Sequence, residues 1–165
     1  LSCNRHEPDK NIEAIIKSFS RFPKKNLFIT SVGSQTDYLK NISKKFKNIK
    51  FMGLVNDKKY RELLSNCIST INFSKNEDFG MSAIEAFASG KPVIAYNHGG
   101  FKETCINKVN SLLVHGNNLE AHLNKILKKY NNNFFLKMKK NCINSSKNYQ
   151  LKLFYKKINN IVNYS

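Results

Sequence analysis

The chain has 165 residues, of which 41% are hydrophobic, so it can fold as one domain around a single core. Its formal net charge is +17, but only three of its 28 basic residues are arginines, whose planar fork suits phosphates and bases. The lysines are spread along the whole chain, so we interpret them as solvated surface and expect no nucleic-acid partner. A peripheral association with an anionic membrane stays open on charge alone.

No apolar run approaches the roughly 20 residues of a membrane-spanning helix, and no signal-peptide pattern is present at the start. The cysteines show no metal-ligand spacing, so we expect neither a zinc site nor a disulfide framework, and a reducing, cytoplasmic setting follows. Among the histidines we expect His98, and then His6, within reach of a ligand. The cysteines are Cys3, Cys67, Cys105 and Cys142.

Short apolar runs alternate with amphipathic segments, which predicts buried strands and helices that pack on them. Strands are expected at Leu1–Asn4, Asn26–Val32, Ile49–Met52, Cys67–Phe73, Pro92–Tyr96 and Asn110–Val114. Helices are expected at Asn11–Phe22, Thr36–Phe46, after a cap at Asn56 or Asp57, from Met81 to a stop at Gly90, and at Phe101–Ile106, Leu119–Tyr130, Phe134–Ser146 and Leu151–Tyr164. The alternation predicts an α/β fold, with a Rossmann-like parallel sheet covered by helices on both faces.

Polar residues follow the first two expected strands. Arg5 and Lys10 lie at the edge where an α/β sheet binds its ligands, and Gly33 and Ser34 form the next turn. Taken alone, the two cations are better explained as ordinary exposed residues, and a single glycine after a strand usually only turns the chain. They become candidate ligand contacts because of an acidic segment further along the chain.

The acidic segment runs from Phe73 to Phe101 and holds two carboxylates eight positions apart. Glu77 is expected on a loop, and Glu85 in a helix that begins at Met81. After the following strand, the turn at Asn97–Gly100 has glycines that let its backbone approach a ligand closely. A loop acid, a helix N-terminus and a glycine turn at neighbouring strand ends predict a site for a polar ligand that carries phosphate.

The sequence EDFGMSAIEAFASGKPVIAYNHGG, which begins at Glu77, resembles the donor-site signature of the retaining glycosyltransferases of family 4, in the C-terminal domain of their GT-B fold. SCNRHEPDKN, at residues 2–11, resembles the strand and loop of this domain that grip the donor diphosphate. NIKFMGLVND, at residues 48–57, resembles its strand and turn beside the base. The likeness covers roughly the whole chain and is nearest to mannosyltransferases.

The resemblance implies a role for each residue at a matching position. Arg5 and Lys10 would neutralise the diphosphate, Glu77 would contact the sugar, and these three residues form the expected catalytic set. Glu85 would bind the ribose hydroxyls. The remaining expected donor-binding positions are Gly33, Ser34, Leu54, Val55, Phe79, Gly80, Met81 and Ser82.

The resemblance also implies the reaction. The donor would be a nucleotide-diphosphate sugar such as GDP-mannose or a UDP-sugar, bound without a metal or other cofactor because two cations and a helix N-terminus face the diphosphate. A glycan, lipid-linked or protein acceptor would be bound by a preceding N-terminal domain. We therefore expect residues 1–165 to be a single Rossmann-like domain from a longer enzyme, inactive alone.

In this family the last helix packs on the N-terminal domain. The corresponding segment here, at about residues 151–164, would therefore expose its apolar side chains. Two alternatives remain: a stand-alone nucleotide- or nucleic-acid-binding Rossmann-like module, and a degenerate structural domain. The side chains expected to be exposed are Phe154, Tyr155, Ile158 and Ile161.

Overall fold

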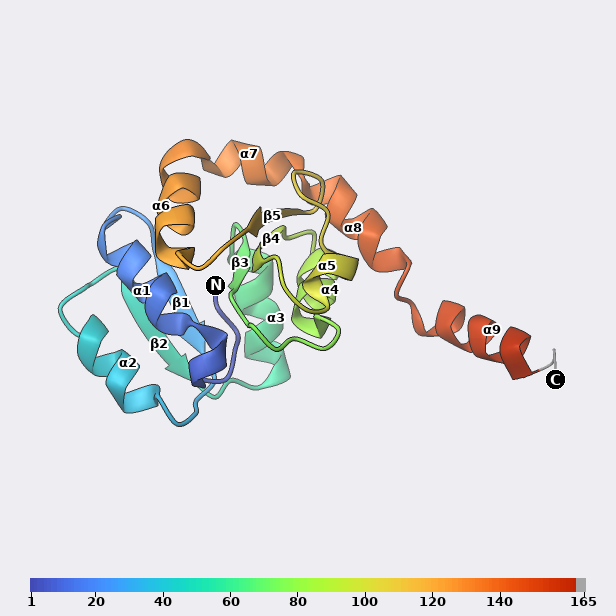
Figure 1. Cartoon of the computed structure of the whole chain (residues 1–165), viewed down its shortest axis with the longest axis horizontal. Helices are drawn as coiled ribbons and strands as arrows, with labels where there is room; N and C mark the ends of the chain where they lie inside the picture. Colours follow the sequence, from blue (N-terminus) through green and yellow to red (C-terminus); the bar gives the residue numbers. More distant parts are fainter. Residues whose placement is uncertain (163–165) are drawn as a thin grey trace.

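A computed structural model describes residues 1–162 of the chain (Figure 1). The strands are β1 (Leu27–Thr30), β2 (Ile49–Gly53), β3 (Thr70–Asn72), β4 (Val93–Tyr96) and β5 (Ser111–Val114). The helices are α1 (Ile12–Ser20), α2 (Thr36–Ser43), α3 (Asp57–Asn66), α4 (Met81–Ala88), α5 (Phe101–Thr104), α6 (Leu119–Lys129), α7 (Asn132–Lys137), α8 (Lys139–Lys147) and α9 (Leu151–Val162). A 3₁₀ turn, η1 (Pro8–Lys10), precedes α1.

All the paired strands run parallel, in two groups. β1 pairs with β2, and β4 lies between β3 and β5. The first two residues join the groups: Ser2 N–H donates to Phe28 O at 2.9 Å on one side, and Ile71 N–H donates to Leu1 O at 2.8 Å on the other. The strand expected at Leu1–Asn4 is thus reduced to a single bridge at Ser2, opposite Ile29.

The central strand β4 buries side chains on both faces, which is why its sequence is continuously apolar, whereas β2 has an exposed lysine, Lys50. In β4, Ile94 packs in one core with α1, α2 and α6, while Val93 and Ala95 pack in the other core with α3, α4 and α8. Figure 1 shows α1, α2 and α6 on one side of the strands and α3, α4 and α5 on the other. The expected α/β fold, with a parallel sheet and helices on both faces, is confirmed.

Element boundaries differ from the expectation where the backbone or the packing interrupts a pattern. β1 ends at Thr30 because Ser31 adopts a left-handed conformation, with φ of 78°. The helix expected at Phe134–Ser146 is two helices, α7 and α8, with a turn at Met138. The break redirects the side chains, because Phe135 packs in the core of α1 and α6 whereas Met138 and Cys142 pack against α4.

The last described helix, α9, projects from the body of the domain (Figure 1). None of its residues is buried, so Phe154, Tyr155, Ile158 and Ile161 are exposed as expected. The expected helix extends to Tyr164, and its final residues lie outside the described ones. No helix within residues 1–162 is both long and apolar enough to cross a membrane.

Candidate functional site

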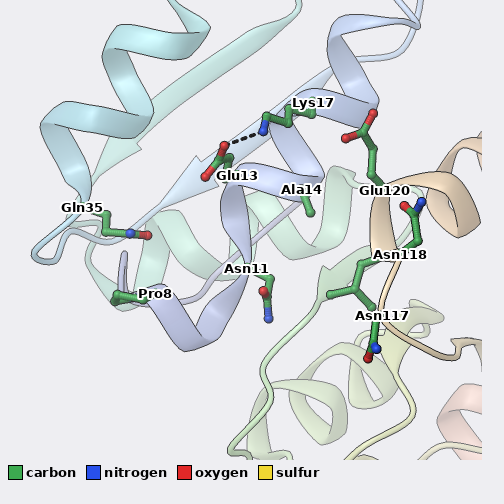
Figure 2. A pocket seen from close by; sticks show the side chains of 10 residues that line it. Pro8, Asn11, Glu13, Ala14, Lys17, Gln35, Asn117, Asn118 and Glu120 are labelled. Atoms are coloured by element: carbon green, nitrogen blue, oxygen red, sulfur yellow. Dashed lines mark ion pairs between the residues drawn. The ribbon is translucent and has the colours of Figure 1, made fainter.

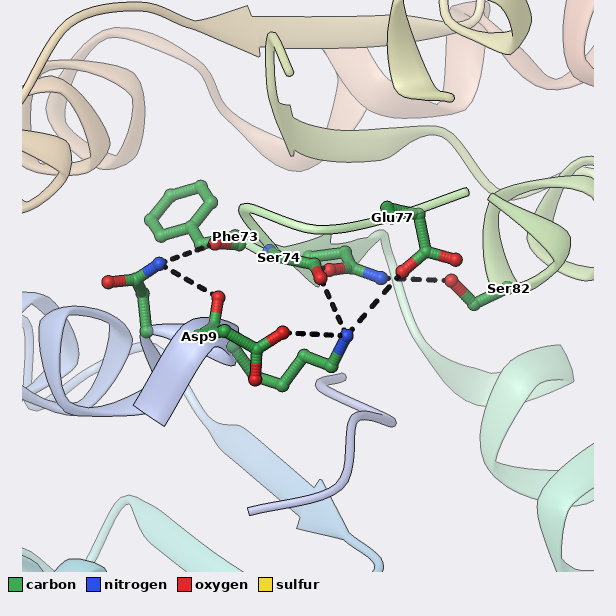
Figure 3. A network of polar contacts seen from close by, with 8 residues as sticks. Asp9, Phe73, Ser74, Glu77 and Ser82 are labelled. Atoms are coloured by element: carbon green, nitrogen blue, oxygen red, sulfur yellow. Dashed lines mark hydrogen bonds and ion pairs between the residues drawn. The ribbon is translucent and has the colours of Figure 1, made fainter. Parts of the chain in front are cut away.

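The site is built from two loops, one after the bridge at Ser2 and the other after β3. One runs from Arg5 through η1, and the other from Phe73 to Gly80, after β3. They are joined by hydrogen bonds between residues far apart in sequence: Lys75 N–H donates to Asp9 O at 2.9 Å, and Asn11 Nδ2 donates to Phe73 O at 2.8 Å. Figure 3 shows the bond to Phe73 and the polar contacts around it, at the point where the two loops meet.

Lys10 is the centre of the network. Its Nζ donates to Ser74 Oγ at 2.7 Å and lies 3.1 Å from Asp9 Oδ2 and 3.9 Å from Glu77 Oε2 (Figure 3). Its side chain is only 14% exposed, so the ammonium is held by protein groups rather than by solvent. The structure therefore brings two of the three expected catalytic residues, Lys10 and Glu77, into one cluster.

Arg5, the third, is an exposed residue of the same loop. Its charge contributes to a lowered pKa of Glu7, although hydrogen bonds from Ser34 are the main cause of that shift. No hydrogen bond or ion pair joins its guanidinium to the Lys10 cluster within the described residues.

Asn72, the last residue of β3, fixes the second loop and was not predicted from the sequence. Its Nδ2 donates to Ser82 Oγ at 2.9 Å, and its Oδ1 accepts from Ser74 N–H at 3.0 Å. The residue is 4% exposed, so a buried amide holds both the loop and the first turn of α4 in place. The signal in the sequence is a polar side chain at the end of the apolar strand segment.

The glycine turn after β4 packs against the acidic loop. Gly100 N–H donates to Glu77 O at 2.7 Å, and a Cβ on Gly100 would lie 2.5 Å from Phe79 Cα. A Cβ on Gly99 would overlap Glu77 O. The close backbone approach expected of this turn is thus made to the loop that carries Glu77, which these glycines position.

The helix α4 begins at Met81, as predicted. Gly80 has a φ of 83°, is buried behind Phe101, and provides no side-chain cap for the helix. Met81 is 56% exposed, and Phe79, at 43% exposed, makes an edge-to-face contact with Tyr149. The N–H groups of this first turn therefore lie beside exposed apolar side chains.

Glu85 lies one turn further along α4, on an exposed part of the helix. Its Oε2 accepts a hydrogen bond from the hydroxyl of Tyr60, a residue of α3, at 2.8 Å. Burial is the main cause of a raised pKa for Tyr60, with Cys3 and Glu85 adding to it, so this hydroxyl keeps its proton.

The turn after β1 binds the carboxylate of Glu7, a residue of the first loop. Ser34 donates to Glu7 through both its N–H, at 3.1 Å, and its Oγ, at 2.6 Å. A Cβ on Gly33 would lie 2.6 Å from Glu7 Oε1, so this glycine is what lets Glu7 reach the turn. The N–H and hydroxyl groups of Ser34, a residue expected to bind the nucleotide sugar, both donate to Glu7 in this structure.

The turn after β2 offers an exposed apolar surface. Leu54 is 76% exposed and Val55 is half-buried, just before α3, which Asn56 caps by accepting from Lys59 N–H at 2.9 Å. This turn can present main-chain groups and an apolar side chain to a flat ring.

The two candidate histidines differ in position. His6 is fully buried: its Nδ1 lies 2.9 Å from Thr36 Oγ1 and its Nε2 lies 3.2 Å from Thr30 O. Burial is the main cause of its lowered pKa. The expectation that His6 lies within reach of a ligand is therefore wrong, because its ring is part of the packing. His98 is exposed and stacks on Tyr96.

A separate open cleft of about 480 Å³ lies between α1 and the start of α6 (Figure 2). Its walls are mostly amide and acidic side chains, and Glu13 in it pairs with Lys17 at 2.6 Å. It shares Pro8 and Asn11 with the first loop but contains none of the expected site residues. Within residues 1–162, no group of three or more His, Cys, Asp or Glu side chains is placed to hold a metal ion.

The strand arrangement, with its two loops meeting beyond the carboxyl ends of the central strands, defines a Rossmann-like domain. The chain belongs to the family of glycosyl transferases group 1, whose model matches residues 1–149. Solved structures with the same fold are GT-B glycosyltransferases.

Particular relatives agree with this assignment. The alpha-1,3/1,6-mannosyltransferase ALG2 of Dictyostelium discoideum is 28% identical over 131 residues, which covers 65% of this chain and 31% of that protein. An uncharacterized glycosyltransferase of Methanocaldococcus jannaschii is 38% identical over 88 residues, covering 52% of this chain and 25% of that protein. The chain thus spans about a third or less of the length of these relatives.

Two solved structures illustrate the shared fold. Anabaena HepE in complex with UDP-glucose has a TM-score of 0.83 at 20% identity, covering 99% of this chain and 48% of that one. The catalytic domain of cholesterol-alpha-glucosyltransferase from Helicobacter pylori has a TM-score of 0.74 at 20% identity, covering 91% of this chain and 99% of that one.

Proposed function

We propose that this domain binds the nucleotide-diphosphate sugar of a retaining glycosyltransferase of family 4 that transfers mannose or another hexose in glycan biosynthesis. The observation that carries the proposal is the Lys10 cluster. An ammonium group and the Glu77 carboxylate, 67 positions apart in sequence, lie 3.9 Å apart beside an uncapped helix start. A sugar diphosphate needs these groups together: positive charge for its phosphates, and an acceptor for its hydroxyls.

The roles follow from the chemistry of the donor. Lys10 and Arg5 would offset the charge that grows on the diphosphate when the glycosidic bond breaks, which is electrostatic stabilisation of the transition state. The first turn of α4 would add N–H groups and its dipole. Glu77 would accept from the sugar and Glu85 from the ribose, with the turn at Leu54 and Val55 beside the base.

We further propose that donor binding needs no divalent metal, because lysine, arginine and a helix start supply the positive charge. The acceptor, a glycan, a lipid-linked saccharide or a protein, would be bound by an N-terminal domain outside this chain. The exposed apolar side chains of α9 would pack on that domain. We place the enzyme in the cytoplasm, with its acceptor in solution or at a membrane surface.

Thermal-shift screening against sugar nucleotides tests the proposal. We expect stabilisation by at least one of GDP-mannose, UDP-glucose or UDP-N-acetylglucosamine, unchanged when a chelator replaces magnesium. Lys10→Met should abolish the shift, whereas Lys24→Met, at an exposed position between α1 and β1, should leave it intact. A chain that none of these donors stabilises, or that they stabilise only with metal, would contradict the respective part.

A further inference from the structure

Tyr60 links two helices of the site. It comes from α3, and its hydroxyl donates to Glu85 Oε2 of α4 at 2.8 Å. Its ring packs in the core that α3 and α4 share, and it lines a small cavity together with Asn72 and Ser82, the pair that fixes the start of α4. The hydroxyl is therefore held by a packed ring, whereas the Glu85 carboxylate stands on an exposed helix surface.

Tyr60 is the only side chain within residues 1–162 that hydrogen-bonds this carboxylate. A carboxylate has two oxygens with about four acceptor sites. The hydroxyl takes one of them on Oε2, so Oε1 remains free for a ligand hydroxyl. A glutamate on a helix surface otherwise samples several rotamers, and ordering it on binding weakens the affinity.

We infer that Tyr60 is a positioning residue, which holds the Glu85 carboxylate ready to accept hydrogen bonds from the ribose of the bound nucleotide. This inference rests on the proposed function, in which Glu85 binds the ribose. Tyr60 itself would not touch the ligand, and its effect would depend on Glu85 and on the ribose hydroxyls. That dependence distinguishes positioning from general support of the fold.

The experiment is a double-mutant cycle measured by chemical-shift titration in NMR, which quantifies weak binding. The ligands are UDP and GDP, each compared with its 2′,3′-dideoxy counterpart. The variants are Tyr60→Phe, Glu85→Gln and the double variant. The matched control is Tyr38→Phe, because the pKa of Tyr38 is raised by another carboxylate, Glu13, away from the site.

We expect Tyr60→Phe to weaken binding of the ribonucleotide by about 3- to 10-fold, the scale of one hydrogen bond, and to leave the dideoxy ligand unchanged. In the Glu85→Gln background the same substitution should cost nothing further. Tyr38→Phe should change neither ligand. Phe keeps the packed ring, and thermal unfolding of each variant checks the fold.

Other outcomes overturn the inference in distinguishable ways. If Glu85→Gln loses the preference for ribose but Tyr60→Phe retains it, the positioning role is wrong and the proposed function stands. If Tyr60→Phe weakens ribose and dideoxy ligands equally, the residue acts only on the fold. If the unaltered chain binds no nucleoside diphosphate, or Glu85→Gln changes both ligands equally, the assigned role of Glu85 fails and the inference fails with it.

Discussion

Replacing Lys10 by methionine removes the ammonium and keeps most of the aliphatic stem. Asp9 and Glu77 then lose the positive charge that lies 3.1 Å and 3.9 Å from their carboxylates. Two unit charges 4 Å apart attract by about 4 kcal/mol at an effective dielectric constant of ~20, but desolvation of the ammonium offsets much of this. Exposed pairs contribute about 0 to 1 kcal/mol, and breaking a buried pair costs about 3 to 5 kcal/mol.

The Lys10 side chain is 14% exposed, and those of Asp9 and Glu77 are 32% and 21% exposed, so the cluster falls between these limits. We expect Lys10→Met to lower the free energy of unfolding by about 1 to 2 kcal/mol, measured by urea denaturation at pH 7. Binding of UDP or GDP should fall by at least about tenfold, since a charged hydrogen bond contributes about 1.5 to 3 kcal/mol.

The control is Lys24→Met, which removes one positive charge from an exposed position outside the site. It should change both quantities by far less than Lys10→Met does. If Lys10→Met loses stability but binds the nucleotide as tightly as the unaltered chain, then the ammonium only joins the two loops. The proposed grip on the diphosphate would then be wrong.

Glu85→Gln should weaken the sugar nucleotide and the bare nucleoside diphosphate alike, whereas Glu77→Gln should weaken only the sugar nucleotide, each by about 1 to 3 kcal/mol. Calorimetric titration of both ligands decides this, and equal losses in the Glu77 variant would refute the assignment. Gly100→Ala should destabilise the fold by about 1 to 3 kcal/mol in denaturation, because its Cβ would lie 2.6 Å from a carbonyl oxygen of the acidic loop. Gly116→Ala, with nothing within 4 Å but a φ of 73°, measures for comparison the cost of left-handed backbone strain without a clash. Burial raises the pKa of Cys105 from the ordinary value of 9.0 to about 11. Above pH 9 the thiol is therefore deprotonated in the unfolded chain but still protonated in the folded chain. The unfolded chain then binds fewer protons, so the free energy of unfolding falls as pH rises. In Cys105→Ala, denaturation between pH 8 and 11 should show a shallower fall, and an identical slope would exclude this thiol as a source.

The fold follows from the sequence because burial on both faces of a parallel sheet leaves a continuous apolar run. Val93–Tyr96 is such a run, and its side chains alternate between the two cores. The cap at Asn56 is equally local, since the side chain bonds an N–H three residues on. The break at Met138 could not be predicted in this way, because it depends on which core each side chain meets.

In the site, too, local features could be predicted from the sequence and contacts between separate elements could not. The positions of Glu77 on a loop and Glu85 in a helix could be predicted from Gly80 and the helical pattern that follows it. The contacts of Tyr60 and Asn72 could not, because each joins its partner through the packing of separate elements. His6 shows the opposite error, since its polar loop suggested exposure while its ring is buried among hydrogen-bond partners.

The groups expected to receive the diphosphate already have anionic partners in this structure. Lys10 lies within 3.9 Å of two carboxylates, and Ser34 donates twice to Glu7. A donor must therefore replace hydrogen bonds to protein carboxylates rather than to water alone, and its negative charge must enter beside Glu7, Asp9 and Glu77. Each new contact therefore adds less affinity, because the binding free energy is the net gain after the lost contacts with the carboxylates are subtracted. Of these carboxylates, Glu77 joins the two loops through Lys10, and Glu7 joins the first loop to the turn after β1. These contacts hold the site in shape at the expense of affinity for the diphosphate.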